Sequence, residues 1–355
     1  MHIEALRRRL RAAGARPIHE ERVLRQWSRA EPQAKGRQRP EDFLPLSLRS
    51  ALPALEAELR ALAVLRADHA SADGSRRLLV GLADGRSVEA VLLPRGGLCV
   101  SSQVGCAVGC VFCMTGLGGL ERQLDSAEMV AQVVLARRLR PVTKVVFMGM
   151  GEPAHNLDNV LDAIDLLGSV GGIGHKNLVF STVGDLRIFD RLGCGPVKPA
   201  LALSLHSTRA ELRMRLLPRA PRVDPAELVE HAERYARATG YPIQYQWTLL
   251  DGVNDGVDEI EGIARLLAGK YAVLNLIPWN RVDGLDFARP DAGRIAAMVQ
   301  ALQRQGVLTK VRQSAGQDVE GGCGQLRARA LEPRAQVVAF AGRPAAPTHE
   351  AVRAR

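Results

Sequence analysis

From residue 98 onward, short β-rich runs alternate with amphipathic helical runs, and this alternation restricts the possible folds more than any other feature. The β-rich runs read LCVSS, TKVVFMG, NLVFST, ALALSL, IQYQWTLL, AVLNLIP and LTKVRQ. Helical patterns separate most of them, for example over 126–139, 157–168, 225–240 and 294–306. Strands that alternate with helices form parallel βαβ units. We therefore predict an α/β fold, built as a full or partial βα barrel over residues 98–330.

The segments on either side of this region have other patterns. Apolar residues recur at helical spacing in residues 1–70, which predicts a small N-terminal helical domain. Residues 71–97 alternate like a strand pair with Asp84 and Gly85 in the turn, which predicts a β extension. Residues 331–355, with GRPAAPTHEAVRAR, are typical of a disordered tail.

The composition excludes some classes of protein. Of the 355 residues, 46% are hydrophobic, which is enough for a full core and excludes disorder as the main state. No apolar run approaches the roughly 18 residues of a membrane helix, and charges lie where a signal peptide would be apolar. We therefore expect a cytoplasmic protein. The net charge of +10 favours a polyanionic partner such as RNA.

Four of the six cysteines, Cys99, Cys106, Cys110 and Cys113, lie within one stretch of 15 residues. In a reducing compartment such a group more often binds a metal or catalyses redox chemistry than forms structural disulfides. The last three have the spacing CxxxCxxC, which puts three thiolates on one loop. They could hold a structural zinc ion, with Cys99 or a distant His as the fourth ligand. They could also hold a 4Fe-4S cluster with one iron left open for a substrate or cofactor.

Polar motifs follow several of the predicted strands. In βα barrels the reactive groups lie at the carboxyl ends of the strands. The candidates are Gly151 and Glu152 in GMGEP, Ser181 in FST, Ser204, Leu205 and His206 in SLH, and Asn280 in IPWN. Each motif alone is also typical of an ordinary turn or strand end. Their order at successive strand ends favours one shared site.

Three residues outside these motifs complete the candidates. Cys323 lies between glycines in GGCG, and a flexible loop could carry its thiol into the barrel mouth. A loop cysteine without a function is the alternative. Cys194 is predicted to be a small core or helix-end residue. Glu89 falls on an alternating strand, where a solvated acid is the simplest interpretation.

The three-cysteine loop, with Phe112 just before its last cysteine, resembles the signature of the radical S-adenosylmethionine (SAM) enzymes. Within that group, CVSSQVGC, SLHS, NLIPWN and CGQL resemble the radical SAM adenine methyltransferases of 23S rRNA and tRNA, the RlmN/Cfr family. The resemblance extends from about residue 15 to residue 330 and is most specific in the barrel. It implies a partial (βα)6-type radical SAM barrel.

The resemblance also implies roles for single residues. Cys106, Cys110 and Cys113 would hold a 4Fe-4S cluster. The implied SAM contacts are Gly151, Glu152, Ser181, Ser204, Leu205, His206 and Asn280. Cys323 would be methylated by one SAM, while a second SAM would supply a 5′-deoxyadenosyl radical. Cys99 would then form a disulfide with Cys323, and Glu89 would accept a proton.

The implied reaction is methylation of carbon 2 of an adenosine in the peptidyl-transferase centre of 23S rRNA, with tRNA as a further candidate substrate. The CMTG sequence that ends the cysteine loop also resembles the carbon-8 relative, so methylation of carbon 8 is an alternative. The other implied partner is a flavodoxin- or ferredoxin-type reductant, with no membrane, and we expect a monomer.

The helical N-terminal part, with its arginines and Trp27, is the expected additional RNA contact, and a solvated helical face is the alternative. Two other functions are compatible with these residues. One is a radical SAM enzyme that modifies a protein, and the other is a zinc-stabilised RNA-binding protein without catalytic activity.

Overall fold

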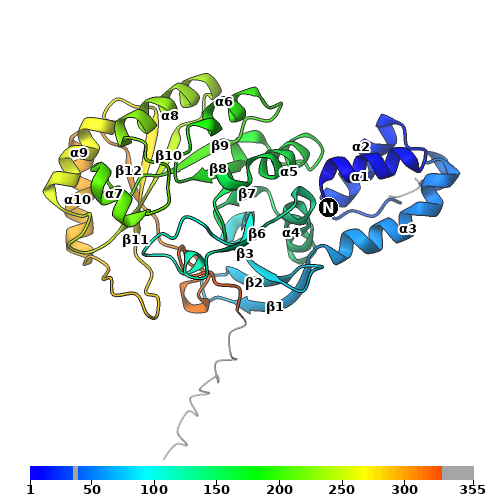
Figure 1. Ribbon diagram of the computed structural model, residues 1–355, viewed down its shortest axis with the longest axis horizontal. Helices are drawn as coiled ribbons and strands as arrows, with labels where there is room; N and C mark the ends of the chain where they lie inside the picture. Colours follow the sequence, from blue (N-terminus) through cyan, green and yellow to red (C-terminus); the bar gives the residue numbers. More distant parts are fainter. Residues whose placement is uncertain (35–38, 330–355) are drawn as a thin grey trace, which may run out of the picture.

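The N-terminal part of the chain is helical. The computed structural model describes residues 1–34 and 39–329, and it contains α1 (Ile3–Ala12), α2 (Pro17–Ser28) and α3 (Leu46–Ala61). These three helices extend from one end of the molecule (Figure 1). In α3 the buried residues are Leu48, Leu52, Leu55 and Leu59. Their helical spacing gives one apolar stripe, as predicted. Trp27 is also buried, with 8% of its surface exposed, so its ring belongs to the core rather than to an exposed RNA-binding face.

One ten-stranded sheet carries most of the remaining chain, in the order β1-β2-β3-β4-β7-β8-β9-β10-β11-β12. Its strands are β1 (Val64–Ala70), β2 (Arg76–Gly81), β3 (Ser87–Leu93), β4 (Gly97–Cys99), β7 (Lys144–Phe147), β8 (Leu178–Thr182), β9 (Ala200–Ser204), β10 (Ile243–Leu249), β11 (Ala272–Pro278) and β12 (Thr309–Val311). The first four strands pair antiparallel, and every pair from β4 to β12 is parallel. The predicted turn at Asp84 and Gly85 joins β2 to β3 and is confirmed.

The helices that connect the parallel strands are α4 (Ser126–Leu139), α5 (Leu157–Ser169), α6 (Arg187–Cys194), α7 (Ala210–Leu216), α8 (Pro225–Thr239), α9 (Val257–Leu267) and α10 (Ala292–Arg304). Six βα units therefore precede the short strand β12, which confirms the predicted partial barrel. Within the described part of the chain β12 pairs only with β11, so hydrogen bonds do not close the barrel. Short 3₁₀ helices lie at Pro40–Asp42, Pro94–Gly96, Met114–Gly116, Pro153–Asn156, His175–Asn177 and Gln317–Val319.

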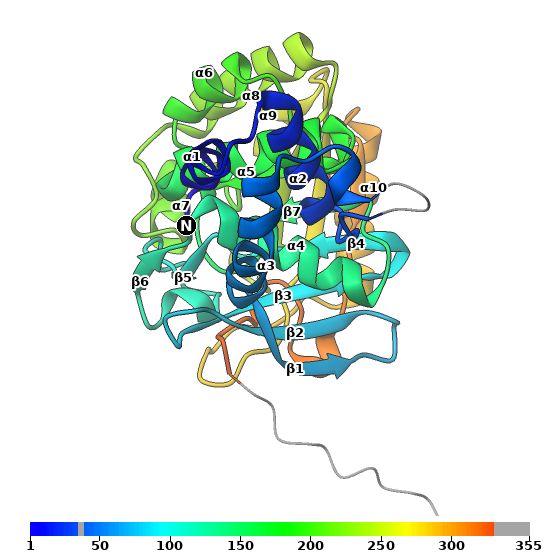
Figure 2. The same cartoon turned by 90° about the vertical axis from the view of Figure 1, so that its right-hand side faces the viewer.

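The prediction that the first 70 residues are helical is wrong for Val64–Ala70. This segment is β1, an edge strand that pairs antiparallel with β2 and curves along the lower border of the molecule (Figure 2). The helical apolar pattern ends at Leu62, and the residues of β1 are half-buried or exposed. Pairing with β2 therefore determines its conformation, and a local pattern does not reveal such pairing. The predicted tail at 331–355 lies outside the described residues.

A separate two-stranded hairpin was not predicted. Its strands are β5 (Gln103–Gly105) and β6 (Leu120–Gln123), and they pair antiparallel on either side of the three-cysteine loop. Because the cysteine loop separates these two short strands in the sequence, local patterns do not show that the strands pair. The hairpin closes the base of that loop.

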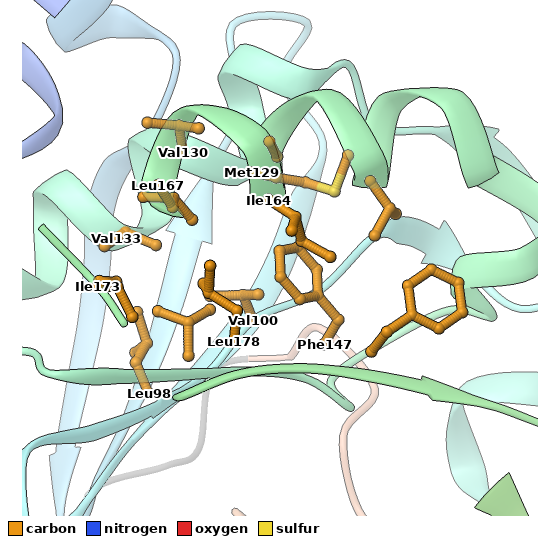
Figure 3. Packing of buried hydrophobic residues seen from close by; sticks show 14 of the residues in the cluster. Leu98, Val100, Met129, Val130, Val133, Phe147, Ile164, Leu167, Ile173 and Leu178 are labelled. Carbon is orange, nitrogen blue, oxygen red and sulfur yellow. The ribbon is translucent and has the colours of Figure 1, made fainter. Parts of the chain in front are cut away.

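The main core lies between the sheet and the helices on its outer face. Leu98 on β4, Phe147 on β7 and Leu178 on β8 point toward α4 and α5 (Figure 3). The opposite face of the sheet instead presents Val146, Val179, Ala200 and Ala202, which form a small separate cluster. Because strand side chains alternate between faces, large residues fill the outer layer while small residues line the interior. The interior therefore keeps space for ligands.

Candidate active site

Two adjoining cavities lie where the parallel strands end. The first has a volume of about 160 Å³ and the second a volume of about 800 Å³. Residues that line both cavities are Cys113, Thr115, Met148, Gly149, Cys323 and Gly324. The larger cavity extends along the barrel interior toward Lys144 at the start of β7. We refer to them below as the first and second cavities.

The three cysteines of CxxxCxxC line one wall of the first cavity. The hairpin fixes their loop, since the amide of Cys106 donates to the Gly119 carbonyl at 2.9 Å. Gly105 has φ of +77°, and a Cβ there would lie 2.0 Å from the Gly119 oxygen, so only glycine fits. Cys113 closes the other end of the loop by donating its amide to the Cys110 carbonyl at 3.1 Å. The wall therefore presents three thiols from one rigidly closed loop.

Burial controls the protonation of these thiols. It raises the pKa of Cys106 to about 12 and also raises the pKa values of Cys110 and Cys113, and neighbouring negative groups add to the effect. Free thiols here stay protonated at neutral pH, and binding an iron or zinc centre would have to displace their protons. Within residues 1–34 and 39–329, no group of three or more His, Cys, Asp or Glu side chains is arranged around a single metal ion.

Glu152 also lines the first cavity and follows β7. Its carboxylate accepts hydrogen bonds from the amides of Ala154 and Val183, both at 3.0 Å. Burial is the main cause that raises its pKa to about 7. Gly151 has φ of +107°, and a Cβ there would lie 2.7 Å from Ser102 Oγ, so the turn requires glycine. A buried carboxylate of this kind gains most from a cationic ligand such as an ammonium group.

His206 follows β9 with a left-handed backbone, at φ of +59°. Its Nδ1 accepts the Thr248 amide at 2.9 Å, and burial lowers its pKa to about 3. The ring is therefore neutral and carries its proton on Nε2, where it can act as a donor. Its edge packs on Phe112, with ring centroids 4.9 Å apart. The aromatic residue before the last cysteine thus couples the cysteine loop to the end of β9.

Most of the other predicted SAM contacts also line the first cavity. Ser181, Ser204 and Asn280 are on its wall. Leu205 is not, because the next position along a strand faces the other way, and its side chain is buried in the main core. Its amide donates to the Gln246 carbonyl at 3.0 Å. Leu205 can therefore offer the first cavity only main-chain atoms.

Cys323 and Cys99 share the wall of the second cavity. Cys323 is exposed and lies on a loop that Asn280 holds, since its Nδ2 donates to the Cys323 carbonyl at 2.9 Å. Cys99 ends β4, and burial raises the pKa of its thiol to about 12, with a smaller contribution from the nearby Cys323. All six cysteines are free thiols. Cys194 is the last residue of α6 and is exposed, so it is a helix-end residue and not a core residue.

Glu89 on β3 is not a solvated acid. It is fully buried and forms an ion pair with Arg77, which is also fully buried. Its second oxygen accepts the Arg327 amide at 2.9 Å. Glu89 lines neither cavity. Its partner Arg77 lies twelve positions before it in the sequence. Its burial follows from the segment 316–329, which packs over the β extension.

Both ends of this segment are attached to the β extension. At the start, the Gly316 amide donates to Asp73 at 2.9 Å and Arg77 donates to the Val319 carbonyl at 3.2 Å. At the end, Arg77 also donates to the Arg329 carbonyl at 2.6 Å. Hydrogen bonds to the β extension thus hold both ends of the loop that carries Cys323. This attachment could not be predicted from local patterns because it joins residues more than 200 positions apart.

Comparison with known proteins decides the family. Residues 100–267 match the Radical SAM superfamily. A protein of Methylibium petroleiphilum named "Probable RNA methyltransferase" is 73% identical over 331 residues, which cover 93% of this chain and 94% of that protein. The chain belongs to the radical SAM RNA methyltransferases. A relative with the same name from Leptothrix cholodnii is 70% identical over 336 residues, covering 95% of this chain and 97% of the relative.

The crystal structure of a radical SAM methyltransferase from Sphaerobacter thermophilus is 34% identical, with a TM-score of 0.79. The match covers 93% of this chain and 98% of that chain, so it includes the N-terminal helices as well as the barrel. Membership of the radical SAM family implies a 4Fe-4S cluster and SAM. The three-thiol wall and the buried Glu152 are the features of this radical SAM RNA methyltransferase that they would contact.

Arg213 on α7 gives an independent test of that fit. It is buried and donates to the carbonyl oxygens of Val183 and Ser204, and its Nε has no hydrogen-bond partner among the described residues. Burial lowers its pKa to about 10, while Cys110 and Glu152 oppose that shift. An anionic centre on the cysteines would stabilise this buried charge. Sequence analysis missed Arg213 because one more arginine on an amphipathic helix is typical of a solvated face.

No helix among the described residues is both long enough and apolar enough to cross a membrane.

Proposed function

We propose that this radical SAM RNA methyltransferase methylates carbon 2 of an adenosine in the peptidyl-transferase centre of 23S rRNA, with tRNA as a further substrate. The observation that carries the proposal is the position of Cys323. Its thiol lies on the wall that separates the two cavities, next to the cysteine loop on one side and to Cys99 on the other. A methyl carrier that first meets SAM and then meets the RNA needs such a position.

In the first cavity the chain's own residues bind and orient the cofactors. Cys106, Cys110 and Cys113 would hold the cluster, with Arg213 stabilising its charge. Glu152 would pair with the ammonium group of SAM, and the Nε2–H of His206 would donate to an acceptor atom of SAM. When bound, the 4Fe-4S cluster supplies the electron that cleaves SAM to the 5′-deoxyadenosyl radical.

The two thiols explain how an unreactive carbon could be methylated. Carbon 2 of adenine lies between two ring nitrogens and is electron-poor, so it cannot attack the SAM methyl group as a nucleophile. In the proposed reaction Cys323 first accepts a methyl group from one SAM. A radical derived from a second SAM would remove a hydrogen atom from that methyl group, and the carbon radical on Cys323 would add to carbon 2. Loss of the ring proton to a base and of the unpaired electron to the oxidised cluster would restore the aromatic ring. The Cys99 thiolate would then attack the Cys323 sulfur, so that the sulfur–carbon bond breaks, the carbon takes up a proton to become the product methyl group, and cellular thiols reduce the resulting disulfide.

Glu89 is the proposed acceptor of the ring proton, although its carboxylate is engaged by Arg77 and Arg327 in this conformation. The role therefore requires the segment that carries Cys323 to move away from the β extension. We further propose that the enzyme acts in the cytoplasm as a monomer, with a flavodoxin- or ferredoxin-type reductant. The basic surface would bind RNA phosphates while the target base leaves its stack and enters the barrel.

Mass spectrometry of nucleosides from 23S rRNA and tRNA, in cells with and without the gene, tests this function. We expect 2-methyladenosine to disappear without the gene and to return with the wild-type gene but not with Cys323→Ala. Loss of 8-methyladenosine instead would favour the carbon-8 alternative. An unchanged methyladenosine content in both RNAs would contradict the proposal. A Cys323→Ala protein that still modifies its substrate would instead indicate an enzyme that acts on a protein.

The metal content of anaerobically purified protein tests the cofactor. We expect brown protein that contains iron and sulfide and cleaves SAM when reduced. Colourless protein with one zinc ion would favour the non-catalytic RNA-binding alternative.

A further inference from the structure

Three cationic side chains line the second cavity: Lys144, Arg95 and Arg312, of which Arg95 is exposed and the other two are half-buried. Lys144 starts β7, where it pairs with Gly97 on β4, and Arg95 lies just before Gly97. Cys99 pairs with Val146 two positions further along the same two strands. At the usual rise of a β-strand, Lys144 therefore lies about 7 Å from Cys99, toward the amino ends of the parallel strands. Arg312 reaches the cavity from the end of β12.

These three cations form no ion pair within the described part of the chain. Arg312 contacts only neutral atoms, Gln246 Oε1 at 3.4 Å and Met148 Sδ at 3.8 Å. Burial lowers the pKa of Lys144, and the positive charge of Arg312 lowers it further, so the two cations are close enough to repel each other. Asp73 is the one carboxylate on the described wall of this cavity. Its oxygens are engaged by the amides of Ser75 and Gly316, at 2.8 and 2.9 Å.

The backbone of Arg95 adds an independent sign of a built site. It is a non-glycine residue in the left-handed region, at φ of 64° and ψ of 31°. An L-residue in that region costs about 1 kcal/mol or more, and such strain clusters at ligand-binding sites. The neighbouring amide of Thr143 donates to the Gly96 carbonyl at 2.9 Å and holds this turn against the start of β7. The strained turn thus puts a third cation beside the other two.

We propose that Lys144, Arg95 and Arg312 bind a phosphate group of the substrate RNA while the target base lies beneath Cys323. This inference rests on the proposed function and specifies how its substrate is held. Two or three uncompensated cations require an anion, and guanidinium and ammonium donors suit phosphate oxygens. In a nucleotide, one ribose separates the base from the phosphate. In the second cavity, the thiols of Cys99 and Cys323 and the three cationic side chains likewise lie on separate parts of the wall. The site would select an adenosine within a phosphodiester chain over free adenosine.

Binding measurements with the full-length, cluster-loaded protein and SAM test the site. The probes are adenosine, adenosine 5′-monophosphate and a short single-stranded RNA. We expect the monophosphate to bind several-fold more tightly than adenosine, and Lys144→Met or Arg312→Gln to abolish this preference. For the RNA, the slope of log affinity against log salt should become about 0.7 less negative for each lost phosphate contact. Lys176→Met is the matched control, because this exposed lysine lines neither cavity and should leave both measurements unchanged.

Equal binding of adenosine and its monophosphate, or unchanged salt slopes in the variants, would overturn the proposal. If inorganic phosphate competes with the monophosphate while the RNA slopes stay the same, the site binds free phosphate and the assignment to RNA is wrong. Lys144→Arg and Arg312→Lys keep the charges and should keep the slope, which separates loss of charge from misfolding. Failure of the proposed function is a separate result, because wild-type protein would then bind the monophosphate selectively yet methylate no RNA.

Discussion

The buried ion pair between Arg77 and Glu89 leads to a prediction about stability whose size follows from the burial of both side chains. Both side chains have 0% exposure. Glu89→Ala would leave the Arg77 charge buried without a carboxylate. Removing one partner of such a pair costs about 3–5 kcal/mol, and the amide of Arg327 would also lose its acceptor. Since whole domains are stable by only about 5–15 kcal/mol, the chain should respond by releasing the segment 316–329.

Two measurements follow this response. Urea denaturation gives the loss in free energy of unfolding, and amide hydrogen exchange over 316–329 reports release of the segment that carries Cys323. The matched control is the double variant Arg77→Met with Glu89→Leu. It removes both charges and should recover the part of the lost stability that comes from the unpaired Arg77 charge, while the carbonyls of Val319 and Arg329 and the amide of Arg327 still lack these partners.

The same variants separate attachment from catalysis. If Glu89 serves only to hold the segment, methylation in the double variant should follow the hydrogen-exchange protection of 316–329, because this variant also lacks the hydrogen bonds to Val319, Arg327 and Arg329. If Glu89 also accepts the ring proton, methylation should stay low even where that protection returns. A Glu89→Ala protein with stability within about 1 kcal/mol of wild type and unchanged exchange over 316–329 would refute the whole account of this ion pair.

Three further predictions concern the first cavity and its wall. Cys323→Ser should abolish methylation in a nucleoside assay while SAM cleavage continues, whereas Cys194→Ser, at an exposed helix end, should match wild type in both. Gly105→Ala should destabilise the cysteine loop by about 3 kcal/mol and reduce iron loading, because the new Cβ meets a backbone oxygen in a left-handed turn; Gly118→Ala, with nothing within 4 Å, should do neither. The pKa of Glu152 is raised to about 7, so its contribution to apoprotein stability is present below about pH 4.5 and is lost as pH rises through 7. The free energy of unfolding of wild type relative to Glu152→Gln should therefore fall by about 3 kcal/mol between pH 4.5 and 8, and a flat difference would contradict the raised pKa.

Local apolar patterns in the sequence predicted several elements at the bounds that the structure shows. Helix α4 has the predicted bounds, and so has β11, because each carries a continuous apolar pattern between turn signals. The position of the site was also predictable, since strand ends of a parallel barrel meet at one edge whatever the loops do. Leu205 shows the limit of this reasoning, because strand alternation turned its side chain into the core.

What the sequence could not predict depends on contacts between distant segments. The edge strand β1 exists because it pairs with β2, and the β5–β6 hairpin pairs across the cysteine loop. Arg213 and Glu89 both have the sequence context of solvated residues. Their burial comes from elements that pack over them, as the segment 316–329 packs over Glu89. The residue pattern of one strand or helix does not show that a distant segment will pack over it.

The two attachments of that segment bear directly on how one thiol can serve two cavities. In the proposed reaction Cys323 would face SAM first and the RNA base second, so the residues around it would move between the two steps. Hydrogen bonds hold the segment at Gly316 and at Arg327, while Glu320 and Gly324 between them have left-handed backbones, at φ of 54° and 85°. Strained and glycine-rich backbone between two fixed ends favours a local hinge over movement of the whole segment. In the proposed reaction these attachments would keep Cys323 at the wall between the two cavities during methyl transfer, and they would open only for Glu89 to accept the ring proton.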